Sequence, residues 1–211
     1  RKIPDDAKPE LMRALGRANA GMHAVEGAWF GYPKEDARFR FDSWSGAFSG
    51  MMGDIMDDGK RRGCKLPYDT IAEVVAANRA RLDAVKTPRL VDFDMWAGNV
   101  FLSNKSGWKF AGVVDFERAF YGDPFADFTS AFFLFDDVEK ESDFRAGYAE
   151  ASGRPLIVTE DDRVRMALYR LYMAVIIFVE AYRYNKPYRL MIQKLYGGKI
   201  RKMAAQLKEG V

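Results

Sequence analysis

The segment from Asp92 to Asp127 constrains the fold most, because it predicts short strands inside a chain whose pattern is otherwise helical. Residues 90–94 are typical of a short strand that runs into a loop. Two further strands are expected at 99–102 and 108–114, joined by a turn over Asn104–Gly107. We therefore expect a small, rigid β-hairpin surrounded by helices.

Polar side chains stand at the ends of these predicted strands. Asp94 lies in the loop, Asn99 follows it after four intervening residues, and Asp115 ends the second hairpin strand. Phosphoryl transfer needs such groups: one carboxylate to orient the attacking hydroxyl, and an amide oxygen with a second carboxylate to hold Mg²⁺. An aspartate, four residues, an asparagine and a later strand-end aspartate also form the pattern of the protein-kinase catalytic loop and metal site.

The rest of the sequence predicts a mainly helical fold with one small β-hairpin, of the α+β class. Apolar residues at three- and four-residue spacing indicate helices, with Ser43, Asp69 or Thr70, and Asp123 as N-caps. The expected helices cover residues 9–24, 44–59, 70–86, 124–135, 141–152, 160–185 and 188–207. Residues 1–211 read as a single domain without internal repeats or a second boundary.

Composition excludes several classes of protein. With 211 residues, 48% hydrophobic residues and a net charge of +3, the chain is typical of a soluble globular domain. Its one cysteine, Cys64, cannot form an internal disulfide, which favours the cytoplasm. The longest apolar run, Leu171–Val179, is too short to span a bilayer. The basic run Lys60–Arg62 adjoins acidic residues and is typical of a solvated helix end, so neither a membrane nor a nucleic-acid partner is expected.

Three motifs in order carry a resemblance to a known family. Residues 90–100 resemble the catalytic loop of the aminoglycoside phosphotransferase and choline kinase family, residues 112–117 its metal-binding strand end, and residues 122–127 the Gly-Asp-Pro-x-x-Asp that follows. Leu11–His23 also resembles the first helix of that family's C-terminal lobe. The resemblance implies a protein-kinase-like fold and a kinase that phosphorylates a hydroxyl of a small molecule.

By this resemblance Asp94 is the catalytic carboxylate and Asn99 and Asp115 are the Mg²⁺ ligands, with ATP or GTP as the phosphoryl donor. The expected partners are a nucleotide and a small-molecule hydroxyl substrate. The family's acceptors include aminoglycosides, choline and sugar-amine adducts. Acidic residues suit a cationic acceptor, and the candidate walls for such a pocket are Asp136, Asp137, Glu139, Glu141 and Glu180. A solvated loop over 136–141 and an arginine partner for Glu180 are the competing interpretations.

Other residues of the motifs have supporting roles by the same resemblance. Asp92, Trp96 and Glu117 are candidates for contacts with the substrate or with the metal's surroundings, and Trp96 equally suits a packing role in the loop. Asp123 and Asp127 are expected to be structural, as a helix cap and a loop anchor.

The chain departs from the family pattern in two ways. First, Asp92 and Phe93 replace the usual His-Gly before the catalytic aspartate, and a second carboxylate so close to Asp94 is expected to raise the pKa of either group. This departure motivates the alternative of a non-catalytic pseudokinase or small-molecule-binding regulatory domain. Second, residues 1–88 lack the Gly-rich strands of a nucleotide-gripping lobe. We therefore interpret the chain as a C-terminal lobe that needs a covalent N-terminal lobe for activity.

Two other interpretations remain open. Asp92-Phe93-Asp94 also resembles the Asp-x-Asp loop of a haloacid-dehalogenase-like phosphatase, although that loop belongs at the start of an alternating α/β chain. The other interpretation is a purely structural helical domain, in which the same Asp and Asn residues serve only as loop formers. His23, the only histidine, is expected to be a core residue and not a metal ligand.

Overall fold

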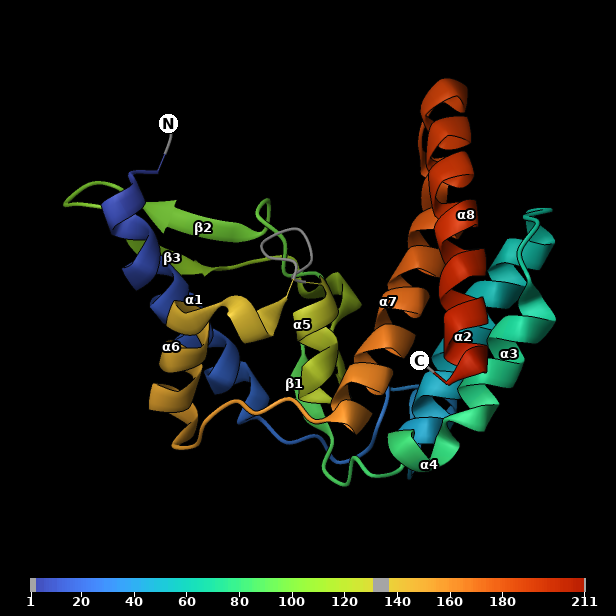
Figure 1. Ribbon diagram of the computed structural model, residues 1–211, viewed down its shortest axis with the longest axis horizontal. Helices are drawn as coiled ribbons and strands as arrows, with labels where there is room; N and C mark the ends of the chain where they lie inside the picture. The colour runs from blue at the N-terminus through green and yellow to red at the C-terminus, as the bar shows by residue number, and fades with distance from the viewer. Residues whose placement is uncertain (1–2, 131–136, 211) are drawn as a thin grey trace.

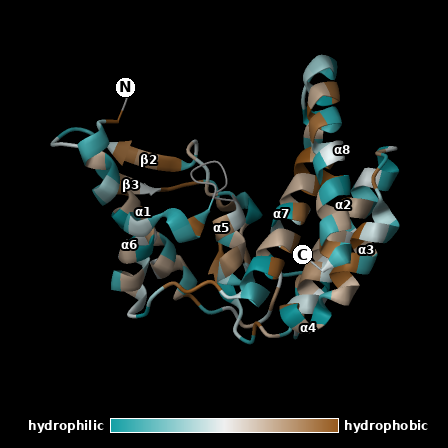
Figure 2. Cartoon of the chain, viewed as in Figure 1, coloured by the Kyte–Doolittle hydropathy of each residue, from teal (hydrophilic) through white to brown (hydrophobic). Residues whose placement is uncertain are grey.

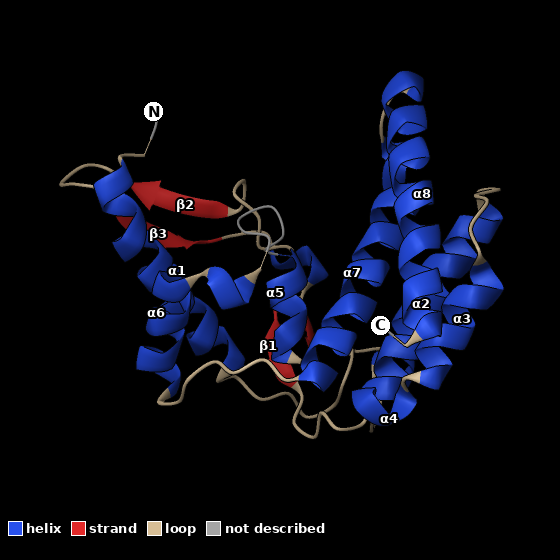
Figure 3. Ribbon diagram, viewed as in Figure 1, coloured by secondary structure: helices blue, strands red, loops and turns tan. Residues whose placement is uncertain are grey.

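The computed structural model describes residues 3–130 and 137–210 and is built mainly from helices (Figures 1 and 3). The longer helices are α1 (Lys8–His23), α2 (Trp44–Arg61), α3 (Tyr68–Ala77), α6 (Ser142–Ser152), α7 (Glu160–Glu180) and α8 (Lys186–Glu209). The shorter α-helices are α4 (Arg79–Leu82) and α5 (Asp127–Ser130). Single 3₁₀ turns are η1 (Asp5–Ala7), η2 (Ala37–Phe39), η3 (Phe116–Arg118), η4 (Pro124–Ala126), η6 (Val138–Lys140) and η7 (Ala181–Arg183).

Two antiparallel strand pairs lie among these helices. In the predicted hairpin, β2 (Val100–Ser103) pairs with β3 (Lys109–Val113), and a register shift interrupts the pairing after Phe101. The second pair joins β1 (Arg89–Val91) to β4 (Phe120–Gly122), a strand that we did not predict. The expected fold class, mainly helical with a small hairpin, is confirmed.

Side-chain N-caps start α2, α7 and α8, whereas α1, α3, α4 and α6 begin without one. The Ser43 side chain accepts a hydrogen bond from the N–H of Gly46 and starts α2, as predicted. The predicted cap of the next helix was wrong: α3 begins at Tyr68, directly after Pro67. The predicted helix over 70–86 is also interrupted at Asn78, whose side-chain amide donates to the carbonyl of Val74 at 2.9 Å and so competes with the helical backbone pattern.

The helices enclose two apolar cores, and Figure 2 shows hydrophobic and hydrophilic residues alternating along the long helices α7 and α8. The larger core joins α2, α3, α7 and α8 around Trp44, Phe48 and Tyr169, and it receives Val91 of β1 and Phe120 of β4. The smaller core joins α1, α5 and α6 and includes Leu15, Phe128 and Phe144. The loop after β1 contributes Phe93 to the larger core and Met95 to the smaller one, so it is held from both sides.

The helix expected at 124–135 is partly described: η4 and α5 cover residues 124–130, and residues 131–135 lie outside the described part. In the parts of the chain that the structure describes, no helix is both long and apolar enough to cross a membrane.

Candidate active site

The loop after β1 is held by one buried carboxylate, Asp127 at the start of α5. Its Oδ1 accepts the N–H of Phe93 at 2.7 Å, and its Oδ2 accepts the N–H of Asp92 at 3.3 Å. The same Oδ2 is 3.1 Å from the side-chain amide nitrogen of Asn19 and 2.9 Å from His23 Nε2, both on α1. Asp127 thus ties the loop backbone to α1, at the position where the sequence predicts a loop anchor.

Asp94 follows this anchored backbone and is half-buried. Its Oδ2 lies 3.6 Å from Nε of Arg118 in η3. Burial raises the pKa of Asp94, the positive charge of Arg118 lowers it, and the negative charges of Asp115 and Glu117 raise it further. The net effect is a raised pKa, which suits a carboxylate that must take up a proton during a reaction.

Arg118 itself is fixed by Glu180 at the end of α7. Two nitrogens of its guanidinium contact the carboxylate of Glu180, at 2.7 Å and 3.4 Å. This forked pair leaves the remaining guanidinium nitrogen facing Asp94. The sequence motifs do not point to Arg118, and an arginine partner for Glu180 was one of two alternatives. The signal that could have found Arg118 is its place three residues after the strand-end Asp115.

The hairpin brings Asn99 and Asp115 to the same end of the strand pair. The N–H of Val114 donates to the carbonyl of Asn99 at 3.0 Å, so Asp115 is the next residue after this pairing. Asn99 is buried, and its side-chain nitrogen donates to the carbonyl of Asp94 at 2.9 Å. Asp115 is exposed and has a φ of 70°, a left-handed conformation that is uncommon outside glycine and recurs at functional sites.

These two residues fit a divalent cation. The bond from Asn99 Nδ2 to the loop leaves its Oδ1 for a metal, and the Asp115 carboxylate has no hydrogen bond or ion pair with any described residue. Oxygen donors are what Mg²⁺ prefers, and it usually takes one or two carboxylates together with phosphate and water. In agreement with so few protein ligands, the described residues form no cluster of three or more His, Cys, Asp or Glu side chains suited to a metal.

Asp92 and Phe93, which replace the His-Gly of the family pattern, precede Asp94 in the loop and are both buried. Asp92 is fully buried, and neither of its carboxylate oxygens has a hydrogen-bond partner among the described residues. Burial, followed by the charges of Asp127, Asp94 and Asp115, raises the pKa of Asp92 to about 8. Phe93 has a φ of 59°, and its buried ring stacks on Tyr172 with centroids 5.5 Å apart. We infer that this packing offsets the cost of a left-handed phenylalanine.

The remaining predicted site residues differ in their surroundings. Trp96 is 44% exposed and lies so close over Gly98 that a Cβ there would overlap its ring. Glu117 is exposed on η3 next to Arg118. Asp123 has partners other than Asp94. It accepts hydrogen bonds from the N–H of Phe125 and from the side chains of Arg165 and Tyr169, the last two at 2.8 Å and 2.7 Å.

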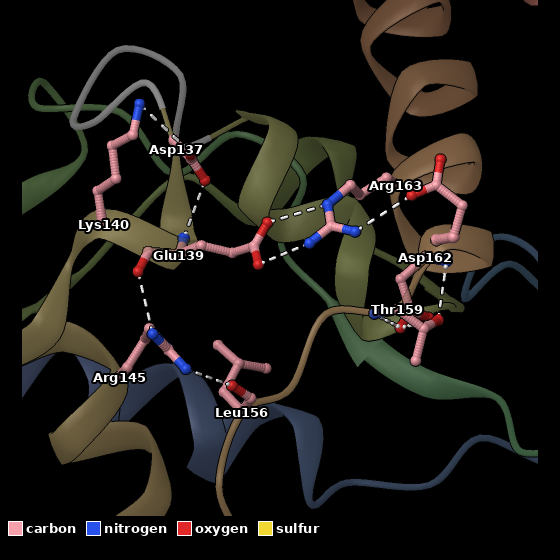
Figure 4. A network of polar contacts seen from close by, with 9 residues as sticks. Asp137, Glu139, Lys140, Arg145, Leu156, Thr159, Asp162 and Arg163 are labelled. Carbon is pink, nitrogen blue, oxygen red and sulfur yellow. Dashed lines mark hydrogen bonds and ion pairs between the residues drawn. The ribbon is translucent and has the colours of Figure 1, made fainter. Parts of the chain in front are cut away.

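Most of the acidic residues considered as pocket walls are hydrogen-bonded to other groups of the chain. Glu139 binds Arg163 through two nitrogens at 2.9 Å and 3.1 Å, and Asp137 accepts the N–H of Glu139 (Figure 4). Glu141 lies at the N-cap position of α6, and Glu180 binds Arg118. Asp136 lies outside the described residues. Of the described candidates, Glu139 and Glu180 are therefore paired with arginines, and Asp137 is paired with a backbone N–H and Lys140.

The fold matches solved structures of kinases that act on small molecules. A Thermobifida fusca protein assigned as a fructosamine-3-kinase superposes with a TM-score of 0.65 at 20% identity, over 97% of this chain and 67% of that protein. Choline kinase LicA of Streptococcus pneumoniae gives 0.63 at 14% identity, over 98% and 67%. Aminoglycoside phosphotransferase APH(4)-Ia, as a thermostable mutant bound to AMP-PNP and hygromycin B, gives 0.63 at 14%, over 99% and 68%. At these identities the likeness establishes the fold, which is protein-kinase-like.

The model of the phosphotransferase enzyme family matches residues 1–169, which is most of the chain. The chain belongs to this phosphotransferase family. A search of curated protein sequences gave no match.

Proposed function

We propose that the chain is the catalytic and acceptor-binding lobe of a small-molecule kinase that transfers the γ-phosphoryl group of ATP or GTP to a hydroxyl. The observation that carries the proposal is the position of Asp94. This half-buried carboxylate lies against Arg118, in a loop that also carries Asn99, and Asn99 adjoins Asp115 at the end of the hairpin.

In this proposal Asp94 orients the acceptor hydroxyl and accepts its proton. The acceptor oxygen then forms a bond to the γ-phosphorus while the bond from that phosphorus to the bridging oxygen breaks, and the nucleoside diphosphate leaves with the electron pair. Arg118, held by Glu180, keeps the Asp94 carboxylate in one orientation. Its positive charge also limits how far burial raises the pKa of Asp94.

Asn99 and Asp115 would hold Mg²⁺ through their side-chain oxygens. When bound, the ion would neutralise the developing charge on the phosphate oxygens. The chain's own contribution is to fix the separation of the two ligands, which the hairpin pairing and the bond from Asn99 to the Asp94 carbonyl provide.

We further propose that an N-terminal lobe, covalently joined to this one, grips the nucleotide. The support is that the chain covers about two thirds of the solved relatives, two of which are named as a kinase or phosphotransferase of a small molecule. One of them is bound to a nucleotide analogue, AMP-PNP.

A pseudokinase remains the second candidate, favoured by Asp92 and Phe93 in place of the family's His-Gly. Nucleotide consumption by the intact protein, with the proposed N-terminal lobe joined to this one, separates the two when it is measured with Mg²⁺ against aminoglycosides, choline-like amines, amino alcohols, sugars and hydroxy acids. Acceptor-dependent release of nucleoside diphosphate is the result expected of a kinase. Saturable nucleotide binding without turnover on any acceptor would contradict the kinase proposal and favour a pseudokinase.

A further inference from the structure

A small apolar cavity lies between α5, α7 and α8. Its volume is about 260 Å³, slightly below the range of about 300–1,000 Å³ typical of ligand sites. Its wall is formed mainly by apolar side chains, among them Met173, Ala174 and Ile177 of α7 and Met203 of α8. These helices run side by side in Figure 1, with α5 on the side of the strands.

Among the described residues, the charged groups in this wall are the two cations Arg170 and Lys199, and no carboxylate is part of it. Arg170 is half-buried, and its guanidinium has no hydrogen bond or ion pair with any described residue. The carboxylate of Asp137 acts on it only at a distance and is engaged by the N–H of Glu139 and by Lys140. Burial lowers the pKa of Arg170, which reflects the cost of holding an unpaired cation away from water. An anion would remove that cost.

The cavity adjoins the supports of the candidate active site. Arg170, Met173, Ile177 and Glu180 follow one another at three- and four-residue spacing and therefore share a face of α7. Glu180, which holds Arg118 against Asp94, is only about one helical turn beyond Ile177 on that face. On the other side, α5 contributes Thr129 to the cavity and Asp127 to the catalytic loop.

We propose that this cavity binds the non-reacting end of the acceptor, and that the acceptor is an amphipathic anion with an apolar body and a carboxylate or similar oxyanion. The apolar body fills the space between α7 and α8, and the oxyanion pairs with Arg170. The reactive hydroxyl then extends along α7 toward Asp94. The role as acceptor site rests on the proposed kinase function, whereas binding of an apolar anion in the cavity does not.

Binding is tested without catalysis by fluorescence titration with anilinonaphthalene sulfonate, an apolar aromatic sulfonate. We expect one saturable site per chain, weakened about tenfold in Arg170→Gln because a charge-assisted contact is lost. Arg201→Gln, an exposed arginine of α8 outside the cavity wall, is the matched control and should bind as the parent does. Ala174→Leu, which reduces the cavity, should also weaken binding. Unchanged affinity in both cavity variants would overturn the proposed site.

The acceptor assignment is tested on the intact two-lobed protein with 12-hydroxydodecanoate, its amide and the matching amine, which share one body and differ in charge. Arg170 and Glu180 are about 15 Å apart along α7, a span that an extended twelve-carbon chain covers. We expect kcat/KM to fall from the carboxylate to the amide to the amine, and Arg170→Gln to raise KM for the carboxylate while kcat changes little. A preference for the amine would overturn the acceptor assignment. If no acceptor turns over while the sulfonate still binds and depends on Arg170, the kinase function fails and the anion site stands.

Discussion

At the scale of single residues, Asp92 is a carboxyl group that folding removes from water without a hydrogen bond from any described residue. Its pKa is about 8 in the folded protein, against an ordinary value of 3.8. At a pH between these two values, the Asp92 carboxyl keeps its proton in the folded state and releases it in the unfolded state. The free energy of unfolding should therefore fall as pH rises from about 4 to about 8.

Asp92→Asn removes this titration because an amide stays neutral. We expect the difference in unfolding free energy between about pH 5 and about pH 8 to shrink by roughly 1–3 kcal/mol relative to the parent protein. Urea unfolding at both pH values measures it. Asp69→Asn, at the exposed start of α3, controls for the loss of a carboxylate elsewhere. An equal pH dependence in Asp92→Asn and the parent would contradict the burial argument.

Arg118 and Glu180 should act on Asp94 as one unit, since Glu180 holds the guanidinium that faces Asp94. We expect Arg118→Gln to lower kcat about 10- to 100-fold and Glu180→Gln to lower it less. The double variant should be no worse than Arg118→Gln alone, because the second change removes only the support of a group already lost. Steady-state kinetics of the three variants provide the test. Additive losses would mean that Glu180 acts independently of Arg118.

The sequence could locate Asp94, Asn99 and Asp115 because their spacing is local to one loop and one hairpin. It could not predict that Arg118 binds Glu180, because these residues are 62 positions apart and no periodic pattern links them. The left-handed backbone of Phe93 was equally hidden, since its support is the ring of Tyr172 on α7.

At the scale of elements, α1 and α6 approach so closely that two glycines meet backbone across the interface. A Cβ on Gly16 of α1 would overlap the carbonyl oxygen of Phe144, and one on Gly147 of α6 would overlap that of Arg13. The neighbouring backbone cannot move aside without separating the helices. This contact also fixes α1, whose Asn19 and His23 hold Asp127 under the catalytic loop.

Two alanine substitutions in α1 should therefore have opposite effects. Gly16→Ala should destabilise the protein by about 2 kcal/mol or more through overpacking. Gly21→Ala, five positions later in the same helix, meets nothing within 4 Å and should stabilise the protein by roughly 0.5–1 kcal/mol through helix propensity. Thermal or urea unfolding measures both. Similar effects of the two substitutions would contradict the close packing of α1 on α6.

Apolar periodicity predicted the long helices because each has one face in a core. It failed at Asn78, where a side chain replaces a backbone partner, and at β4, whose three residues are a strand only because they pair with β1. Strand β4 pairs with β1, which lies far from it in the sequence. A segment of three residues is also too short to show a periodic pattern.

At the scale of the whole molecule, the motifs predicted the family and the kinase-like fold, because three of them occur in the right order. They did not predict the cavity between α5, α7 and α8 or the position of Arg170 in its wall. A cavity depends on how distant helices pack, and the same apolar residues would appear in the sequence if the space were filled.

The central claim is that Asp94 performs phosphoryl transfer to a small-molecule hydroxyl. The most direct measurement quantifies, by mass spectrometry, the phosphorylated acceptor formed from nucleotide and Mg²⁺ by the intact two-lobed protein. The same protein carrying Asp94→Asn and the control Asp69→Asn are measured beside it. We expect product from the unmutated protein and the control. Asp94→Asn should form at least about 100-fold less product while its thermal stability stays near that of the unmutated protein. Product from a folded Asp94→Asn variant at the parental rate would contradict it.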